Sequence, residues 1–278
     1  MKNILSIDLE SWIHHYIDAV KPEIKISSHE KKNLVDLYIN HATVNILNLL
    51  EKHDQKATFF VVGEIFEWDP EIIEEIEKRG HEIGYHSHNH NIITNAEMLE
   101  DELKQSHDFI KRFNPIGYRA PFIHITRDCM ACLKHWGFKY SSSTYSAYSM
   151  TRINGVYEIP VSSISLWKKQ ENDSRMPKPL NLKSFFTSIP FGSGIFFAIL
   201  GSKIGYFINY LNNRNIPAII FIHPWQLYKI DEISRFSFYL KVLFRNFLCT
   251  PYTINVLKNV EILFKRHHFV SFKDFYKF

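Results

Sequence analysis

Residues 57–86 read ATFFVVGEIFEWDPEIIEEIEKRGHEIGYH. The apolar run 57–62 predicts a buried strand. Asp69 followed by Pro70 predicts the start of a helix, because aspartate caps helix N-termini and proline suits the first turn. Gly80 ends that helix, and residues 81–86 are predicted to form the next strand. This order is typical of two parallel strands joined by a helix.

The same alternation continues on both sides of this stretch. Strands are predicted at 3–7, 118–121, 139–142, 156–159, 218–223 and 269–272, and helices at 41–53, 94–113, 126–136 and 253–266. Strands that alternate with helices indicate a parallel sheet wrapped by helices. The length of 278 residues suits one large domain or two small ones, and the hydrophobic content of 45% is ordinary for a globular protein.

Two motifs carry the residues of a possible metal site. Asp8 and Glu10 lie two positions apart on the first strand, so both carboxylates point to one side of it. His86 and His90 lie four apart and can reach one metal ion from one turn of chain. Two imidazoles and one carboxylate leave room for water, which is the pattern of a hydrolytic metal centre, and the other carboxylate could serve as a general base. The alternative is a pair of loop histidines in a chain that has 15 of them.

Four elements in order carry a family resemblance: Ser6-Ile7-Asp8-Leu9-Glu10, His86-Ser87-x-x-His90, Arg119-Ala120-Pro121-Phe122 and Phe221-Ile222-His223-Pro224-Trp225. The chain resembles polysaccharide deacetylases of the NodB-homology type, and among them the branch found with exosortase and exopolysaccharide gene clusters. The resemblance loosely spans residues 2–165 and 190–278. It implies an α/β fold that is a distorted, incomplete (β/α)7 barrel. It also implies one catalytic domain over residues 1–278, with an irregular insertion at about 165–200.

The resemblance implies a metal-dependent hydrolase of carbon–nitrogen bonds other than peptide bonds. The metal ligands would be Glu10, His86 and His90, with Glu10 where the commoner form of the family has aspartate. One divalent ion is expected, with zinc favoured and iron, cobalt, nickel and manganese left open.

The resemblance also implies the acid–base groups. Asp8 would be the general base, Arg119 would pair with it, and His223 would be the general acid. Related deacetylases often carry an aspartate in the region of 140–143 that partners the acid histidine, and this chain has serines at 141–143. Glu158 is a candidate replacement, with a structural salt bridge as the alternative.

Aromatic and proline side chains near the motifs are candidates for binding substrate. Sugar rings stack on such surfaces, so Trp12, Pro121, Phe122 and Trp225 are predicted substrate contacts, with ordinary core packing as the alternative. Tyr145 is a further aromatic residue near the motifs. The expected reaction removes N-acetyl or other acyl groups from an amino sugar in polysaccharide or surface-glycan biosynthesis. A cyclic-amide hydrolase of the allantoin type and a non-catalytic glycan-binding relative are the alternatives.

Charge and the position of the first motif bear on partners and location. The net charge of +4 and the pI near 8.7 are too small to indicate nucleic acid, but they suit an anionic membrane or glycan. A catalytic residue at position 8 leaves no room for a cleavable signal, so a cytoplasmic location, at the inner face of the membrane, is expected. The substrate would then be a lipid- or nucleotide-linked sugar.

One apolar stretch could touch a membrane. Residues 195–211 are predicted to form a helix packed on the barrel, and an interfacial contact through residues 191–200 and Lys203 is the alternative. Three cysteines argue against a disulfide framework, and Cys129 and Cys132 are expected to be small buried side chains.

Overall fold

The computed structural model describes residues 1–278 except 12, 15–26, 37–38, 147–149, 166–187 and 228–255. Its centre is a parallel sheet whose strands lie in the order β12, β1, β2, β3, β4, β5, β8. These strands are β12 (Ile219–Ile222), β1 (Lys2–Leu9), β2 (Thr58–Val61), β3 (Glu82–Tyr85), β4 (Gly117–Tyr118), β5 (Tyr140–Ser141) and β8 (Val156–Glu158). In addition, β13 (His268–Val270) runs parallel to β1.

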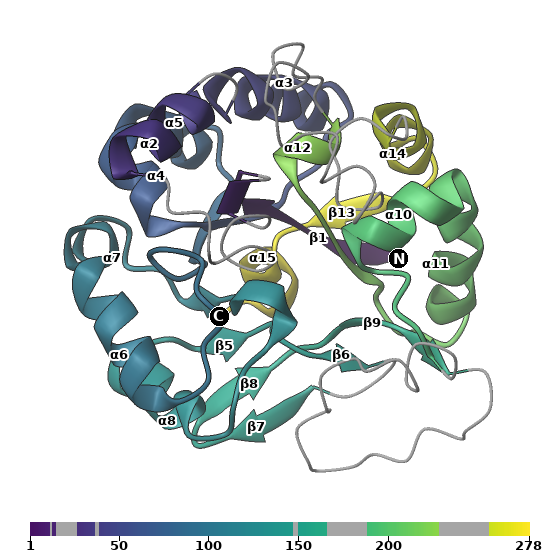
Figure 1. Ribbon diagram of the computed structural model, residues 1–278. Helices are drawn as coiled ribbons and strands as arrows, with labels where there is room; N and C mark the ends of the chain where they lie inside the picture. The colour runs from purple at the N-terminus through teal and green to yellow at the C-terminus, as the bar shows by residue number, and fades with distance from the viewer. Residues whose placement is uncertain (12, 15–26, 37–38, 147–149, 166–187, 228–255) are drawn as a thin grey trace.

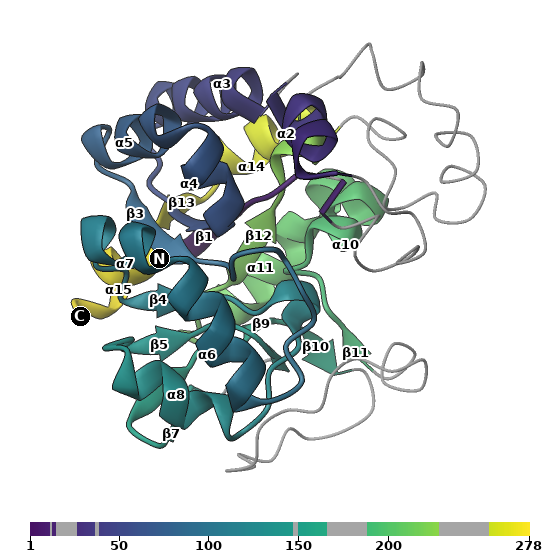
Figure 2. The same ribbon diagram turned by 60° about the vertical axis from the view of Figure 1, so that its left-hand side comes forward.

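Helices surround this sheet, and Figure 1 looks down the middle of the ring that they form. The outer helices are α2 (Ser28–Asp36), α3 (Ile39–Lys52), α4 (Gly63–Trp68), α5 (Pro70–Lys78), α6 (Ala96–Gln105), α7 (His107–Phe113), α8 (Cys129–His135), α10 (Gly194–Leu200), α11 (Ile204–Asn212) and α14 (Val256–Phe264). Figure 2 shows α5, α6 and α7 outside β3 and β4. The predicted distorted, incomplete barrel is therefore confirmed.

The barrel is not closed by a direct pairing of β8 with β12 in the described residues. A short parallel pair, β6 (Tyr145–Ser146) and β9 (Val161–Ser162), lies between them. Ile219 N–H donates to the Ser162 hydroxyl at 2.9 Å, which attaches β9 to the start of β12. An antiparallel pair, β10 (Ile164–Ser165) with β11 (Ser188–Ile189), follows at the edge.

The N-terminal end of the barrel is closed by α15 (Phe272–Tyr276), which lies opposite the rim where the strands end (Figure 2). The Ser271 hydroxyl caps this helix by accepting from Asp274 N–H at 3.1 Å. The last predicted strand, 269–272, therefore stops at Val270, because Ser271 starts a helix.

The predicted helices 94–113 and 126–136 differ from the structure. The predicted helix 94–113 is divided into α6 and α7 at Ser106, where φ is −90° and ψ is 23°. The Ser106 hydroxyl lies 3.0 Å from Tyr85 Oη and 2.9 Å from His88 Nδ1, so contacts with the sheet and the motif loop compete with a continuous helix. The helix predicted at 126–136 begins at Cys129.

Strands β6, β9, β10 and β11 were not predicted from the sequence, and neither was β7. β7 (Thr151–Ile153) pairs with β8 in antiparallel fashion. The turn between them is Asn154-Gly155, and both residues have positive φ, 51° and 89°. Asn-Gly is the commonest signal of a two-residue hairpin, so the sequence contained this information.

The apolar stretch 195–211 is not one helix. It forms α10, the short turn η2 (Gly201–Lys203) and α11, divided at Gly201, whose φ is +55°. Within the described residues, every helix is too short or too polar to cross a membrane. Phe191 and Phe197 are buried in the core, which is the packed arrangement expected for this stretch.

Candidate metal centre

The motif residues lie at or just beyond the carboxyl ends of neighbouring strands. Glu10 follows β1, His86 follows β3, Arg119 follows β4 and His223 follows β12, while Asp8 is near the end of β1. Because these strands are parallel, their carboxyl ends share one rim of the barrel, where barrel enzymes place their sites. The structure brings these side chains and His90 together at that rim.

Glu10 is at the centre of this group and is 1% exposed. Its Oε2 lies 3.4 Å from His86 Nε2 and within ion-pair distance of His90 Nε2, and its Oε1 lies 3.3 Å from His223 Nε2. One ligand atom from each of Glu10, His86 and His90 lies within 4.8 Å of the others. Within the described residues, neither carboxylate oxygen of Glu10 has a hydrogen-bond partner. A buried carboxylate of this kind fits a cation that the imidazoles share.

The orientation of His86 is set by its second nitrogen. Its Nδ1 lies 2.7 Å from the carbonyl oxygen of Arg119, and because a carbonyl only accepts, Nδ1 must carry the proton. The Nε2 lone pair then faces Glu10. Metal-binding histidines are commonly held this way.

The histidine charges also act on Glu10. Burial by itself would raise the pKa of the Glu10 carboxyl, but the positive charge of the His90 and His223 rings beside it, with His86 also close, holds that pKa well below its usual range. The carboxylate is therefore ionised, as a metal ligand must be.

The loop that carries His90 is tightly turned. Ser87 and His90 both have positive φ, 63° and 61°, and the Ser87 hydroxyl accepts from His90 N–H at 3.0 Å. Glu102 on α6 supports the loop, because its carboxylate accepts from His88 N–H at 2.6 Å and Asn89 N–H at 2.9 Å. Glu102 was missed in the sequence, since nothing there connects a helix residue to the motif. His88 points away from the centre, as predicted, toward Ser106.

Asp8 and Arg119 form a buried pair. Arg119 Nη1 lies 3.2 Å from both carboxylate oxygens of Asp8, and its Nη2 donates to the hydroxyls of Ser6 and Ser142 at 3.2 and 3.0 Å. The guanidinium also lies over the rings of Phe60 and Phe221, 4.6 and 4.9 Å from their centroids. Arg119 is fully buried, so it is not a surface charge, and it holds Asp8 in one orientation.

Glu158 is not the partner of His223, which corrects the prediction. Its Oε1 accepts from Ser143 N–H at 2.7 Å and from the Thr144 hydroxyl at 2.8 Å. His223 Nδ1 instead lies 3.1 Å from Gln226 Oε1. Glu158 belongs to β8, whereas Gln226 lies three residues after His223 in α12 (Pro224–Leu227) and is therefore near enough to reach it.

A cavity of about 150 Å³ opens beside the centre. Of the predicted substrate contacts, Phe122 lines it. Pro121 and Trp225 are buried and do not line it. The Trp225 ring instead stacks on His223, with ring centroids 4.8 Å apart. Trp12 lies outside the described residues. Tyr145, the other aromatic residue noted near the motifs, also lines the cavity. The remaining wall was not predicted, and it is formed by Ala120, Ile123, Ser193, Ile195 and Phe221.

Tyr145 and Ser193 supply hydroxyl groups to this wall and are hydrogen-bonded to each other. Burial raises the pKa of Tyr145 to about 12, so its hydroxyl stays protonated and can donate. Ser193 belongs to Gly192-Ser193-Gly194, which stands out in the sequence but cannot be assigned to the site without the fold.

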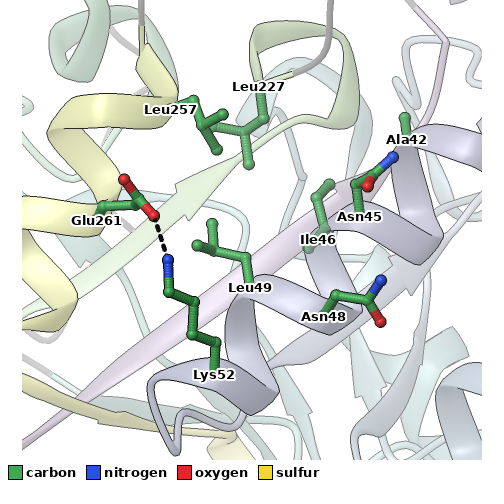
Figure 3. Close-up of a pocket in the computed structure, with 9 residues that line it drawn as sticks. All are labelled: Ala42, Asn45, Ile46, Asn48, Leu49, Lys52, Leu227, Leu257 and Glu261. Atoms are coloured by element: carbon green, nitrogen blue, oxygen red, sulfur yellow. Dashed lines mark hydrogen bonds and ion pairs between the residues drawn. The ribbon is translucent and has the colours of Figure 1, made fainter.

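A second hollow lies away from the rim. It is a groove between α3 and α14, with Leu227 at one end (Figure 3). Its floor is mostly aliphatic, and Lys52 Nζ and Glu261 Oε1 form an ion pair 3.0 Å apart across it. None of the motif residues lines this groove, so the site is assigned to the rim.

Residues 34–141 match the family model described as polysaccharide deacetylase. This match supports the polysaccharide deacetylase family. A peptidoglycan-N-acetylglucosamine deacetylase of Bacillus cereus is 30% identical over 101 residues, which is 35% of this chain and 47% of that protein. A peptidoglycan deacetylase of Helicobacter pylori is 38% identical over 106 residues, 35% of each chain. The chain thus spans about half or less of these relatives.

The fold is also found among solved structures. The crystal structure of a "putative polysaccharide deacetylase" from Mycobacterium smegmatis superposes with a TM-score of 0.56 and 17% identity, covering 80% of this chain and 76% of that one. At this identity the likeness concerns the fold alone, and it agrees with the barrel described above.

Proposed function

We propose that this protein is a metal-dependent deacetylase that removes N-acetyl or other acyl groups from an amino sugar. The observation that carries the proposal is Glu10, whose buried oxygens lack hydrogen-bond partners among the described residues and face three imidazoles. The buried Asp8–Arg119 pair beside it completes a hydrolytic arrangement. The deacetylases named among the relatives support the same reaction.

Glu10, His86 and His90 would hold one divalent ion, for which nitrogen and oxygen ligands favour zinc and also suit iron, cobalt, nickel or manganese. When bound, such an ion would polarise the acyl carbonyl and lower the pKa of a water molecule. Asp8, oriented by Arg119, takes the proton of the attacking water. His223 donates a proton from Nε2 to the leaving nitrogen. The products are acetate and a free amine.

The walls of the cavity favour a small acyl group as the part of the substrate that the protein binds most closely. Its walls combine the apolar side chains of Phe122, Ile123 and Phe221 with the hydroxyls of Tyr145 and Ser193. Apolar walls suit a methyl group, and hydroxyls suit the polar atoms of an amide or a sugar. We therefore favour an acetylated amino sugar over a cyclic amide.

The source of the sugar follows from the resemblance rather than from the geometry. We propose a lipid- or nucleotide-linked sugar in surface-glycan biosynthesis, handled in the cytoplasm at the inner face of the membrane. We propose no nucleic-acid partner, since the net charge is only +4.

The test is acetate release from acetylated amino-sugar oligomers and carriers, measured with zinc, with each of the other metals and after chelation. The expected result is turnover that chelation abolishes and that one metal restores. Metal binding without turnover of any acetylated sugar would contradict the proposed reaction, and absence of metal binding would favour a non-catalytic glycan-binding protein.

We also propose a weak membrane contact through the outer face of α11. The predicted residues Phe191 and Phe197 cannot provide it, because they are buried. Tyr206 and Tyr210 are 76% and 42% exposed, and Lys203 and Arg214 flank them. No aspartate or glutamate lies between Asp173 and Asp231, so this part of the chain carries only positive charge. Exposed tyrosines among cations suit an anionic interface.

Vesicle sedimentation tests this contact. Binding to vesicles with anionic lipids at low salt, lost in a Tyr206→Ser, Tyr210→Ser variant and at high salt, is expected. Protein that stays in the supernatant at low salt would refute it.

A further inference from the structure

The short turn after β12 holds the acid histidine in an unusual way. His223 precedes α12, Pro224 is the first residue of that helix, and Gln226 is the third. Gln226 is 5% exposed, and its Oε1 accepts from His223 N–H at 3.0 Å while lying 3.1 Å from His223 Nδ1. One amide oxygen therefore faces both the backbone and the ring of the same residue.

This arrangement determines where the ring proton resides. A backbone N–H can only donate, so the Gln226 atom that faces it must be the carbonyl oxygen and not the amide nitrogen. That oxygen can only accept, so His223 Nδ1 must carry a proton. In the neutral ring the lone pair then belongs to Nε2, which lies 3.3 Å from Glu10 Oε1 at the cavity.

We propose that Gln226 is a positioning residue that fixes the Nδ1–H tautomer and the ring orientation of His223, so that Nε2 is the atom that exchanges protons with substrate. The functional part of the proposal rests on the proposed deacetylase reaction. Trp225 assists by stacking on the imidazole, with an angle of 19° between the ring planes.

A glycine on another element makes room for Gln226. A Cβ added at Gly194, the first residue of α10, would lie 2.4 Å from Gln226 Oε1 and 2.9 Å from its Nε2. The restriction is one of space, because Gly194 does not have a positive φ. The Gly192-Ser193-Gly194 turn thus contributes Ser193 to the cavity wall and leaves the space that Gln226 occupies.

A plainer role for Gln226 must be separated from this one. A glutamine at the third helical position that reaches back to the backbone N–H before the helix is half of a capping box. Capping alone would affect stability but not the tautomer of His223. The two roles therefore predict different results for a variant that keeps the shape of the side chain and removes its acceptor.

The first experiment reads the tautomer directly. Protein labelled with ¹⁵N-histidine is studied by long-range ¹H–¹⁵N correlation, with His223 identified as the signal lost in His223→Ala. A proton on Nδ1 is expected in the wild type and in Gln226→Glu, whose carboxylate also accepts. In Gln226→Met and in Gly194→Ala, the Nε2–H tautomer should become populated. An unchanged tautomer in Gln226→Met would overturn the proposal, and because no turnover is needed, this holds even if no acetylated sugar is a substrate.

The second experiment is a double-mutant cycle on acetate release. Gln226→Met should lower kcat about 10- to 100-fold, less than the ~10²–10⁴-fold expected for loss of the acid itself, with little change in KM or in bound metal. In a His223→Ala background the same substitution should cost less than about twofold, because the residue that it positions is gone. An equal loss in both backgrounds would show a structural role and overturn the proposal. Absence of turnover in the wild type would instead refute the deacetylase reaction and leave the tautomer measurement to decide.

Discussion

Glu10 shows how much a single buried side chain can indicate. An ionised carboxylate away from water is costly unless it is paired, hydrogen-bonded or bound to metal. Glu10 is surrounded by His86, His90 and His223, yet in the described residues its oxygens accept no hydrogen bond. The charges nearby explain why it is ionised, and the proposed cation would account for its open oxygens.

Metal content is the direct test of this residue. The protein should bind about one divalent ion per chain, and His86→Ala combined with His90→Ala should empty the site. His88→Gln is the matched control, because His88 is in the same loop but contacts Ser106 instead. Metal measured by atomic spectroscopy should fall only in the double variant. Full occupancy in that variant would rule out these ligands.

Asp8 should be separable from metal binding. In Asp8→Asn the amide can still accept from Arg119 but cannot take a proton, so turnover should fall by ~10²–10⁴-fold while the bound metal stays constant. Acetate release and metal content measured on the same sample check this. Near-normal turnover would remove Asp8 from the mechanism.

At the scale of single residues, the sequence contained most of the centre. Asp8, Glu10, His86 and His223 lie at or after the end of a predicted strand and Arg119 lies within one, and parallel strands bring such positions together. Gln226 and Ser193 could not be assigned in this way. Their roles depend on side-chain direction and on how α10 packs, which no spacing in the sequence encodes.

Among the elements, α6 has a role beyond covering the sheet. Glu102 accepts from two backbone N–H groups of the motif loop and from Asn91 Nδ2 at 2.7 Å. This helix therefore holds the loop in the strained conformation that aims His90 at Glu10.

Removing that support should weaken metal binding without touching a ligand. Glu102→Ala should lower metal affinity about 10- to 100-fold and reduce the free energy of unfolding by about 1–3 kcal/mol, since the backbone N–H groups of His88 and Asn89 lose their acceptor. Glu97→Ala is the control, because Glu97 is exposed on the same helix. Competition with a chelator of known affinity measures the effect. Equal affinities in the two variants would contradict the supporting role.

Element boundaries were predicted less well than element types. The long helix is interrupted at Ser106, and the last strand gives way to α15 at Ser271. Both changes occur at serines whose hydroxyls bond to other groups, and serine competes with regular structure in this way. Whether a given serine does so depends on partners far away in the sequence, such as Tyr85 for Ser106.

In the whole molecule, the two ends of the barrel have different tasks. The carboxyl rim holds the candidate site, whereas the other end is closed by α15 and by buried polar groups. There, Thr58 Oγ1 accepts from Phe272 N–H at 3.0 Å, and Glu82 accepts from Lys273 N–H at 2.8 Å and from the hydroxyls of Thr58 and Tyr140. Substitutions at this end are expected to change stability and leave the site intact.

His81, at this closed end, predicts how stability depends on pH. Burial, with Lys56 and Arg79 nearby, lowers its pKa from 6.5 to about 4, and its Nδ1 accepts from Ala57 N–H at 3.3 Å. The folded state thus prefers the neutral ring. Its contribution to stability is complete above pH 6.5 and is lost as the pH falls from there toward 4, by about 1–3 kcal/mol.

The matched variant is His81→Asn, whose side-chain oxygen can replace the Nδ1 acceptor but does not titrate. We compare the free energy of unfolding in urea of this variant with that of the wild type. The difference, variant minus wild type, should increase as the pH falls from 7 to 4, because only the wild type then has to bury a charged ring or unfold. His135→Asn, at an exposed position, should follow the wild type at every pH. Parallel curves for wild type and His81→Asn would mean that the buried histidine does not control this part of the acid response. Acetate release at neutral pH should be unaffected, since His81 lies at the end of the barrel away from the rim.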